Sequence, residues 1–412
     1  MKTLLCALLA LCLAPARARP GEVTLSGLLD TKASFVPVAG PEADRFSFGF
    51  EEYANLRLKT DAGEYITFHA ACNLIAAAGI PARTAEAIGA SGSSALLSTN
   101  FVAGENYAAA LELERLYCRI TRGALDVDAG LMRLAFGYGT VFSSSDYLNP
   151  RNPLFPDARP RGVLGISAAY YPEVPGGSGG TDIKVQTFAA APRNPLDGSG
   201  RGALFGALGE CHWDAASLQG MYHFEAPDRG SGYGVHRAGL SVKTDAVIRR
   251  RLSSDIIIGL TLDALYQYNH EALTGIDGLS VSAGADYSFY DGKWYVAAAY
   301  LFSGRESTTS RIRTPAGFAN RHYLYALCRY HFTDYTRAGL HGIAGFDDLS
   351  FTPVATVEHE VFQGFTLSLT CQVPLDRDLF TGNGKRGEFG PLPPDAAEGA
   401  YARITLKALL RL

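Results

Sequence analysis

The chain has 412 residues, of which 47% are hydrophobic and only 19% are charged, and its formal net charge is −4. This apolar and aromatic content excludes an intrinsically disordered protein, and the weak net charge argues against nucleic-acid binding. After the N-terminus no apolar stretch reaches the roughly 18 residues of a transmembrane helix, which argues against a helical membrane bundle. Abundant Gly and Tyr with few Met favour β structure.

The first element in chain order is an export signal. Lys2 supplies a positive start, residues 4–13 form an apolar run, and small residues precede a cleavage position after Ala18. The run is too short to span a membrane as a helix, so we predict a cleaved secretory signal peptide over residues 1–18 and a single domain over residues 19–412. A lipoprotein signal ending at Cys12 is a weaker alternative, because the bulky Leu11 precedes that cysteine.

The cysteines give no sign of a metal site or a disulfide framework. Two of the 7 lie in the signal, and the others are single and widely spaced. Zinc ligands usually occur in closely spaced pairs, and an odd, scattered set is a poor disulfide framework. We therefore expect no metal and no cofactor, and we interpret the remaining cysteines as small apolar wall residues: Cys72, Cys118, Cys211, Cys328 and Cys371.

The body of the chain alternates apolar and polar residues with a period of two, most clearly over residues 279–289 and 402–412. The alternating runs are longer than the ~5–6 residues of ordinary strands and match the ~9–11 residues of a tilted membrane crossing. A soluble β-sandwich also alternates, but with shorter strands. We predict strands at 23–34, 45–60, 64–76, 106–121, 124–137, 162–172, 181–190, 202–211, 213–224, 233–244, 255–269, 278–290, 293–303, 321–333, 337–347, 351–362, 364–374 and 400–412.

The predicted fold is all-β, a transmembrane antiparallel up-and-down β-barrel of about 18 strands, or 16 if neighbouring segments merge. Only a closed barrel satisfies the backbone of strands in a bilayer. Tight turns at Gly63, Gly123, His212, Gly292 and Gly364 alternate with longer connections such as 77–105, 138–161 and 375–399. One end with turns and one with loops, each with a ring of aromatic residues, is typical of outer-membrane barrels.

A barrel of this size holds a water-filled lumen unless it is plugged. Charges of both signs are expected to face it, and they could impose a transverse field on a passing solute; a solvated periplasmic rim without a selective role is the alternative. The candidate lumen charges are Arg57, Lys59, Arg403, Lys407 and Arg411 near the junction of the first and last strands, and Glu112, Glu114, Asp126 and Asp128 on the fourth and fifth.

Residues 133–162 carry the strongest local signal. Gly137 and Gly139 permit a sharp departure from the wall, and four prolines stiffen the chain after them. We predict that the 138–161 loop folds into the lumen and narrows it; an outer loop that packs on its neighbours is the alternative. The candidate constriction residues are Arg133, Asp146, Arg151, Asp157, Arg159 and Arg161.

This segment resembles a motif of outer-membrane porin-like families, including the alginate-export and phosphate-selective porins: an Arg, a Gly-x-Gly turn, a Phe, an Asp and an Asn-Pro. The matching residues are Arg133, Gly137-Tyr138-Gly139, Phe142, Asp146 and Asn149-Pro150. The resemblance implies a large monomeric or trimeric barrel that conducts small hydrophilic solutes. It also implies that Arg133 faces the pore, which here would need a register shift near Gly130.

The sequence thus predicts a porin in the outer membrane of a diderm bacterium. Expected partners are outer-membrane lipid, the barrel assembly machinery and small hydrophilic solutes, with a homotrimer as one possible assembly. A non-conducting barrel that binds a ligand, polysaccharide or host partner through its long loops is the alternative. We expect no enzyme, because the isolated histidines accompany no recognisable nucleophile motif.

Overall fold

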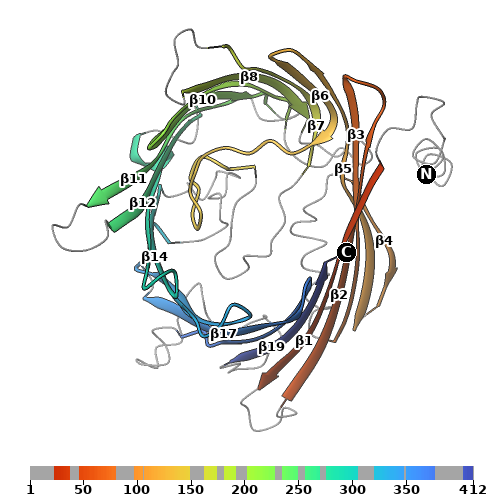
Figure 1. Cartoon of the computed structure of the whole chain (residues 1–412), viewed down its shortest axis with the longest axis vertical. Coiled ribbons are helices and arrows are strands. Elements are labelled where there is room, and N and C mark those ends of the chain that lie inside the picture. The colour runs from red at the N-terminus through yellow and green to blue at the C-terminus, as the bar shows by residue number, and fades with distance from the viewer. Residues whose placement is uncertain are drawn as a thin grey trace.

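The computed structural model places most of the chain in one antiparallel sheet that closes on itself into a barrel (Figure 1). It describes residues 23–37, 46–79, 97–104, 106–148, 162–173, 181–191, 202–227, 234–248, 256–269, 275–304, 320–347, 349–375 and 402–411. The signal peptide predicted over residues 1–18 therefore lies outside the described residues. Within them, no helix is long and apolar enough to cross a membrane.

The sheet contains 19 strands. Their bounds are β1 Val23–Pro37, β2 Phe46–Asp61, β3 Ile66–Gly79, β4 Leu97–Ala103, β5 Tyr107–Arg122, β6 Leu125–Met132, β7 Val163–Tyr170, β8 Asp182–Ala191, β9 Leu204–Trp213, β10 Ala216–Glu225, β11 Val235–Ile248, β12 Ile256–Tyr268, β13 Leu279–Phe289, β14 Trp294–Ser303, β15 His322–His331, β16 Thr336–Gly345, β17 Ser350–Phe362, β18 Phe365–Gln372 and β19 Arg403–Arg411. A short 3-10 helix, η1 (Gly275–Gly278), precedes β13.

Eighteen of these strands make the wall, because β3 pairs directly with β5 and leaves β4 out of the ring. Apart from β3 and β5, the wall strands pair in chain order, and β1 pairs with β19 from Leu28↔Arg411 to Phe35↔Ile404, which closes the barrel. The predicted junction of the first and last strands is thus confirmed, as is the antiparallel barrel of about 18 strands. Closure leaves no open edge in the wall, as a bilayer requires.

Three details differ from the sequence prediction. The predicted turn at His212 is wrong: β9 runs to Trp213, and the chain turns at residues 214–215. Within the predicted 77–105 loop, β4 forms a hairpin with β5. The strand predicted over 124–137 ends at Met132, since the chain then leaves the wall. One edge of β5 pairs with two strands in turn: Ala108–Leu113 pair with β4, and Leu116–Arg122 pair with β6.

The outward face of the wall is apolar. Along most strands, exposed residues such as Leu240, Leu262 and Leu406 alternate with less exposed polar ones, because successive side chains of a strand point to opposite faces. The five cysteines outside the signal are half-buried and unbridged, and by this alternation they lie on the outward face. The sequence prediction of apolar wall cysteines agrees with that position.

Irregularity in the wall is concentrated around β5 and β6. The β3–β5 ladder shifts register where Ala71 pairs with Arg115 and Cys72 with Leu113. Glu114 is the extra residue, so Glu114 and Arg115 both point into the lumen, with the Arg115 Nε 3.4 Å from Glu114 Oε1. Alternation alone would place Arg115 on the outward face, so a β-bulge adds a lumen charge that the sequence prediction missed.

Gly130 is the position in β6 where a side chain is least tolerated. Its φ is +129°, and a Cβ atom would lie 2.4 Å from the Leu116 carbonyl oxygen in β5. We expect Gly130→Ala to destabilise the barrel by about 1–3 kcal/mol, because it combines a strained backbone with a clash against the main chain. The temperature at which the folded band is lost on a semi-native gel measures this effect.

Gly209→Ala is the matched control, since a Cβ there meets no atom within 4 Å. Equal unfolding temperatures for the two variants would contradict the assignment of strain to Gly130.

Candidate pore constriction

After β6 the chain turns inward. Residues 133–148, here called the inward segment, leave the wall at Met132 and run inside the ring of strands toward β10–β12 (Figure 1, yellow). Gly137 has a φ of +78°, a conformation that a residue with a Cβ adopts only under strain. The part of the predicted 138–161 loop that the structure describes, residues 138–148, thus lies in the lumen.

Asp263 on β12 is the main anchor of the inward segment. Its carboxylate accepts hydrogen bonds from the backbone N–H of Tyr138 (3.1 Å), the backbone N–H of Gly139 (2.9 Å) and the Ser143 hydroxyl (2.9 Å). The side chain is fully buried (0% exposed). Backbone amides and a hydroxyl compensate for the loss of solvent, and hydrogen bonds to an ionised acceptor are the strong kind.

Serine side chains hydrogen-bond Ser144 and Ser145 of the inward segment to the wall. The Ser145 and Ser241 hydroxyls lie 3.0 Å apart and share a hydrogen bond. The Ser144 backbone N–H donates to the Ser282 hydroxyl over 3.3 Å, and the Ser280 hydroxyl donates to the Ser144 hydroxyl over 3.2 Å. Since Ser241, Ser280 and Ser282 come from β11 and β13, these bonds flank Asp263 on both sides.

Apolar packing holds much of the inward segment against β7–β12, and Phe142 packs on the other side against β14–β16. Phe136 and Tyr147 stack with ring centroids 6.2 Å apart, and the His223 ring lies 4.4 Å from Phe136. The Arg237 guanidinium lies 4.2 Å from the Tyr147 ring centre. The buried cluster consists of Met132, Leu134, Phe136, Tyr147, Leu148, Val163, Phe188, Ala190, Leu204, Leu208, Met221 and Leu265. This side of the lumen is therefore filled by a small hydrophobic core.

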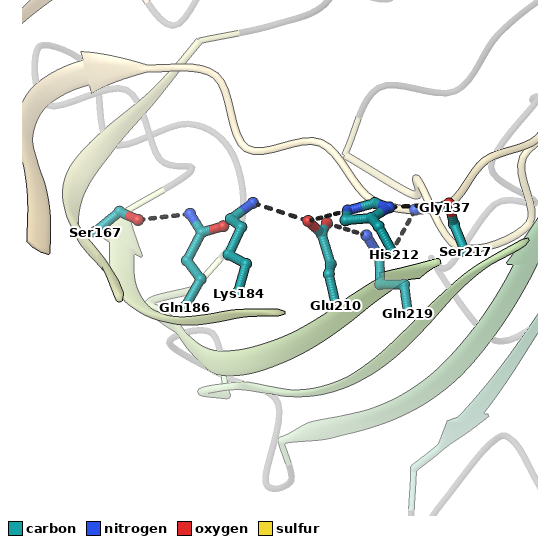
Figure 2. A network of polar contacts seen from close by, with 8 residues as sticks. All are labelled: Gly137, Ser167, Lys184, Gln186, Glu210, His212, Ser217 and Gln219. Carbon is teal, nitrogen blue, oxygen red and sulfur yellow. Dashed lines mark hydrogen bonds and ion pairs between the residues drawn. The ribbon is translucent and has the colours of Figure 1, made fainter. Parts of the chain in front are cut away.

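A polar network runs along the lumen face of β7–β10 to the start of the inward segment (Figure 2). Glu210 is its centre: it accepts a hydrogen bond from the Gln219 amide over 2.6 Å and lies 3.3 Å from the Lys184 ammonium. Gln219 in turn accepts the Gly137 N–H over 2.7 Å. The network therefore connects the charged groups of β8 and β9 to Gly137, where the inward segment turns.

The network extends on both sides of this centre. His212 lies 3.6 Å from Glu210 and 2.9 Å from the Ser217 hydroxyl. Beside Lys184 on β8, the Gln186 amide donates to the Ser167 hydroxyl of β7 over 2.6 Å as a separate pair. Neutral polar groups lie on both sides of the Lys184–Glu210 ion pair, and this pairing leaves little net charge on the row.

Tyr138 sits at the bend of the inward segment. Burial raises the pKa of its phenol to about 12, and the nearby carboxylates of Glu210 and Asp263 add to the effect. The hydroxyl is buried and has no hydrogen-bond partner among the described residues. The side chain therefore stays a neutral phenol over the physiological pH range.

A cavity of about 390 Å³ opens between the inward segment and β13–β15. Thr140 and Val141 of the segment form one side. The Arg329 guanidinium lies 5.8 Å from the centre of the Tyr295 ring on the opposite wall. The remaining lining residues are Ser288, Gly292, Ala297, Leu327 and His331. A polar solute could contact both the segment and a cationic wall here.

The predicted constriction residues fall into two groups. Asp146 is buried in the inward segment at 2% exposure, and Arg133 is exposed just after β6. The pairing of β6 with β5 and β7 continues through Gly130 without a register shift, so the shift required by the family resemblance is absent. The other predicted residues, Arg151, Asp157, Arg159 and Arg161, lie outside the described residues.

The candidate lumen charges form separate local pairs. Glu112 and Glu114 are buried and bonded to amides: the Asn73 amide donates to Glu112 over 3.3 Å, and the Asn55 amide to Glu114 over 2.8 Å. Arg119 binds Asp128 through two hydrogen bonds of 2.7 and 2.8 Å.

The remaining candidates cluster near the β1–β19 seam or near the turns. Lys407 lies 3.3 Å from the buried Asp30. Arg403 and Asp126 are half-buried, and Arg57, Lys59 and Arg411 are exposed. Within the described ranges no three His, Cys, Asp or Glu side chains lie close enough to hold a metal ion.

Sequence reasoning missed the residues that fix the segment, above all Asp263, Gln219 and Ser241. Each occupies a lumen-facing position of a predicted strand, and an Asp within an otherwise apolar strand could have drawn attention to position 263. Nothing in the sequence indicates which part of the chain such a carboxylate would bind.

No protein-family model and no curated protein matches the chain. Several solved structures are similar to it in fold. OccAB3 of Acinetobacter baumannii is 9% identical with a TM-score of 0.57, over 95% of this chain and 99% of that one. OccK2 (OpdF) of Pseudomonas aeruginosa, solved with glucuronate, is 9% identical with a TM-score of 0.55, over 95% and 98%. A BenF-like porin from Pseudomonas fluorescens Pf-5 is 11% identical with a TM-score of 0.55, over 95% and 98%.

The similarity extends over nearly the whole of each chain, and at this level of identity it concerns the fold. The chain therefore has the fold of a porin β-barrel.

Proposed function

We propose that the protein is a porin of the outer membrane of a diderm bacterium. In this proposal small hydrophilic solutes diffuse through its water-filled barrel past a constriction formed by the inward segment and the rest of the 138–161 loop. The attachment of the segment to the lumen wall at Asp263 carries the proposal, because a non-conducting barrel has no need of a rigid partial obstruction. The porin fold of the neighbouring structures supports it.

Liposome swelling tests this function. Liposomes that contain the purified protein are diluted into isotonic solutions of uncharged solutes of increasing size. We expect fast swelling with the smallest solutes and a steep decline as size increases, because the segment narrows the lumen. Liposomes that swell no faster than protein-free ones would contradict the porin and favour a surface-binding barrel.

We further propose that Arg133, Asp146, Arg151, Asp157, Arg159 and Arg161 line the constriction. Charges at a narrow point have the largest influence on which ions pass. Arg151→Glu and Arg159→Glu should therefore each shift the reversal potential in a salt gradient toward cation preference. Arg122→Glu, at the tight turn after β5, is the control. An unchanged reversal potential in both constriction variants would reject these residues as constriction residues.

We also propose that the candidate lumen charges influence which solutes pass. Arg57, Lys59, Arg403, Lys407 and Arg411 lie on β2 and β19, on either side of β1, whereas Glu112, Glu114, Asp126 and Asp128 lie on β5 and β6. Only β3 lies between β2 and β5, so the two sets of charges occupy one continuous part of the wall. We propose that they act on a passing solute from that side of the lumen.

Biogenesis and assembly form the last part of the proposal. We propose that residues 1–18 are removed on export, that residues 19–412 form one barrel domain, and that the barrel assembly machinery inserts it into the lipid, with a homotrimer as one possible assembly. The narrower resemblance to alginate-export or phosphate-selective porins stays a prediction, because the similar solved structures are Occ and BenF-like proteins.

A further inference from the structure

Four hydroxyl side chains form a continuous row across four adjacent strands of the wall. Thr356 of β17 pairs with Thr370 of β18, Thr370 pairs with Thr405 of β19, and Thr405 pairs with Ser34 of β1. The Thr356 and Thr370 hydroxyls are 3.3 Å apart, and so are those of Ser34 and Thr405. We call these four residues the hydroxyl row.

The hydroxyl row faces the lumen. The three threonines are half-buried and alternate along their strands with exposed apolar residues of the outward face, such as Val357, Leu369 and Leu406. Ser34, which pairs with Thr405, is more buried, at 7% exposure. The row belongs to the part of the wall made by β17–β19 and β1, whereas the inward segment packs on β7–β12 and, through Phe142, on β14–β16. The hydroxyls are therefore on a different side of the lumen from the filled one.

Glycines flank the row at both ends, and beyond Gly339 the next paired residue is Arg329 of β15. Thr356 pairs with Gly339 of β16, and Ser34 pairs with Gly49 of β2, which in turn pairs with Gly79 of β3. Adjacent strands are ~4.8 Å apart, so the four hydroxyl positions extend over ~14 Å. Because barrel strands tilt by ~35–45° from the barrel axis and the row crosses them at a right angle, the row runs obliquely, partly around the pore and partly along it.

The charges beside the row compensate one another. Lys32 lies 3.3 Å from Glu51 and 3.7 Å from Asp30, and Lys407 lies 3.3 Å from Asp30. Arg337 forms an ion pair with Glu358. These three cations and three carboxylates sum to zero. Arg403, two residues before Thr405, adds one cation, and its Nε has no hydrogen-bond partner among the described residues.

We propose that the hydroxyl row is a binding track for uncharged polyhydroxylated solutes, such as saccharides of one or two rings. Each hydroxyl both donates and accepts a hydrogen bond, which matches the hydroxyls around a sugar ring. The length of the row fits a disaccharide. Most of the charges next to the row are compensated in ion pairs, so hydrogen bonding is the main interaction that it offers a solute. The inference rests on the proposed porin function and names a solute class for it.

Planar-bilayer recording with sucrose as the probe tests the track. The purified full-length protein carries a KCl current, and sucrose is added in steps. We expect a saturable reduction of the current beyond the effect of viscosity. In Thr356→Val/Thr370→Val/Thr405→Val the half-blocking concentration should rise by ~5-fold or more, because each lost hydrogen bond weakens binding several-fold. The KCl current itself should stay the same.

Two controls make the test specific. Thr261→Val removes a half-buried hydroxyl of β12, opposite the track, and should leave the half-blocking concentration unchanged. Ser34→Ala removes the smallest member of the row and should raise that concentration on its own, which covers the case in which the triple variant does not fold.

The outcomes separate the track from the channel. A KCl current without saturable sucrose block, or equal block in wild type and the row variants, would overturn the track and leave the channel intact. Absence of any KCl current would overturn the proposed porin function and the track with it.

Discussion

Asp263→Ala should release the inward segment and raise the conductance of the barrel. Asp263 accepts three hydrogen bonds from the segment and is fully buried. Its removal leaves the backbone N–H groups of Tyr138 and Gly139 without an acceptor, at a cost of about 1–3 kcal/mol for each group that stays buried. The Ser143 hydroxyl keeps the Phe136 carbonyl oxygen as an acceptor over 3.2 Å. The segment can escape this cost only by leaving the wall, which widens or destabilises the passage.

Single-channel recording and limited proteolysis measure the release. We expect a larger and noisier current than in wild type and new cleavage within residues 133–148. Asp263→Asn keeps one acceptor oxygen and should give an intermediate result. Asp286→Ala removes a lumen-facing carboxylate of the neighbouring strand β13, for which no bond to the segment is found among the described contacts, and is the control. Wild-type conductance and proteolysis in Asp263→Ala would show that the segment does not depend on this anchor.

Ser145→Cys/Ser241→Cys should form a disulfide between the inward segment and β11 almost quantitatively. The two hydroxyl oxygens are 3.0 Å apart, and both residues are at most 1% exposed. This spacing is compatible with the ~3.5–4.5 Å separation of Cβ atoms in a disulfide. The native cysteines lie on the outward face, so they do not compete for the new pair.

Peptide mapping by mass spectrometry, with and without reductant, detects this bond. Ser145→Cys/Ser167→Cys is the control, because the Ser167 hydroxyl is bonded to Gln186 rather than to the segment. Equal cross-linking of both pairs would mean that the segment moves freely in the lumen, contrary to its fixed position. A cross-link confined to the Ser145–Ser241 pair would show that the inward segment is held against β11.

The wall of the barrel was predictable because one physical constraint acts on every strand. Lipid on one side and water on the other impose alternation, so segments such as 255–269 and 278–290 coincide with β12 and β13 to within one or two residues. Two features escaped this reasoning. The bulge at Glu114 breaks the alternation that defines the faces, and β4 lies outside the ring and is free of the constraint.

The site was predictable only in outline. Glycines and prolines after β6 indicated that the chain leaves the wall, and Gly137 indeed marks the turn. The anchors were not predictable, because a pairing such as Asp263 with the Gly139 amide joins residues 124 positions apart and depends on the curvature of the whole barrel. Charges dominated the sequence prediction, whereas serines, a glutamine and a buried aspartate hold the described part of the segment.

Single-channel current through the purified wild-type protein in a planar bilayer tests the central claim most directly. A closed barrel with a fixed inward segment should give discrete, uniform steps, and Asp263→Ala should give larger ones under the same conditions. Purified, folded protein that inserts into the bilayer but produces no steps would contradict a conducting barrel.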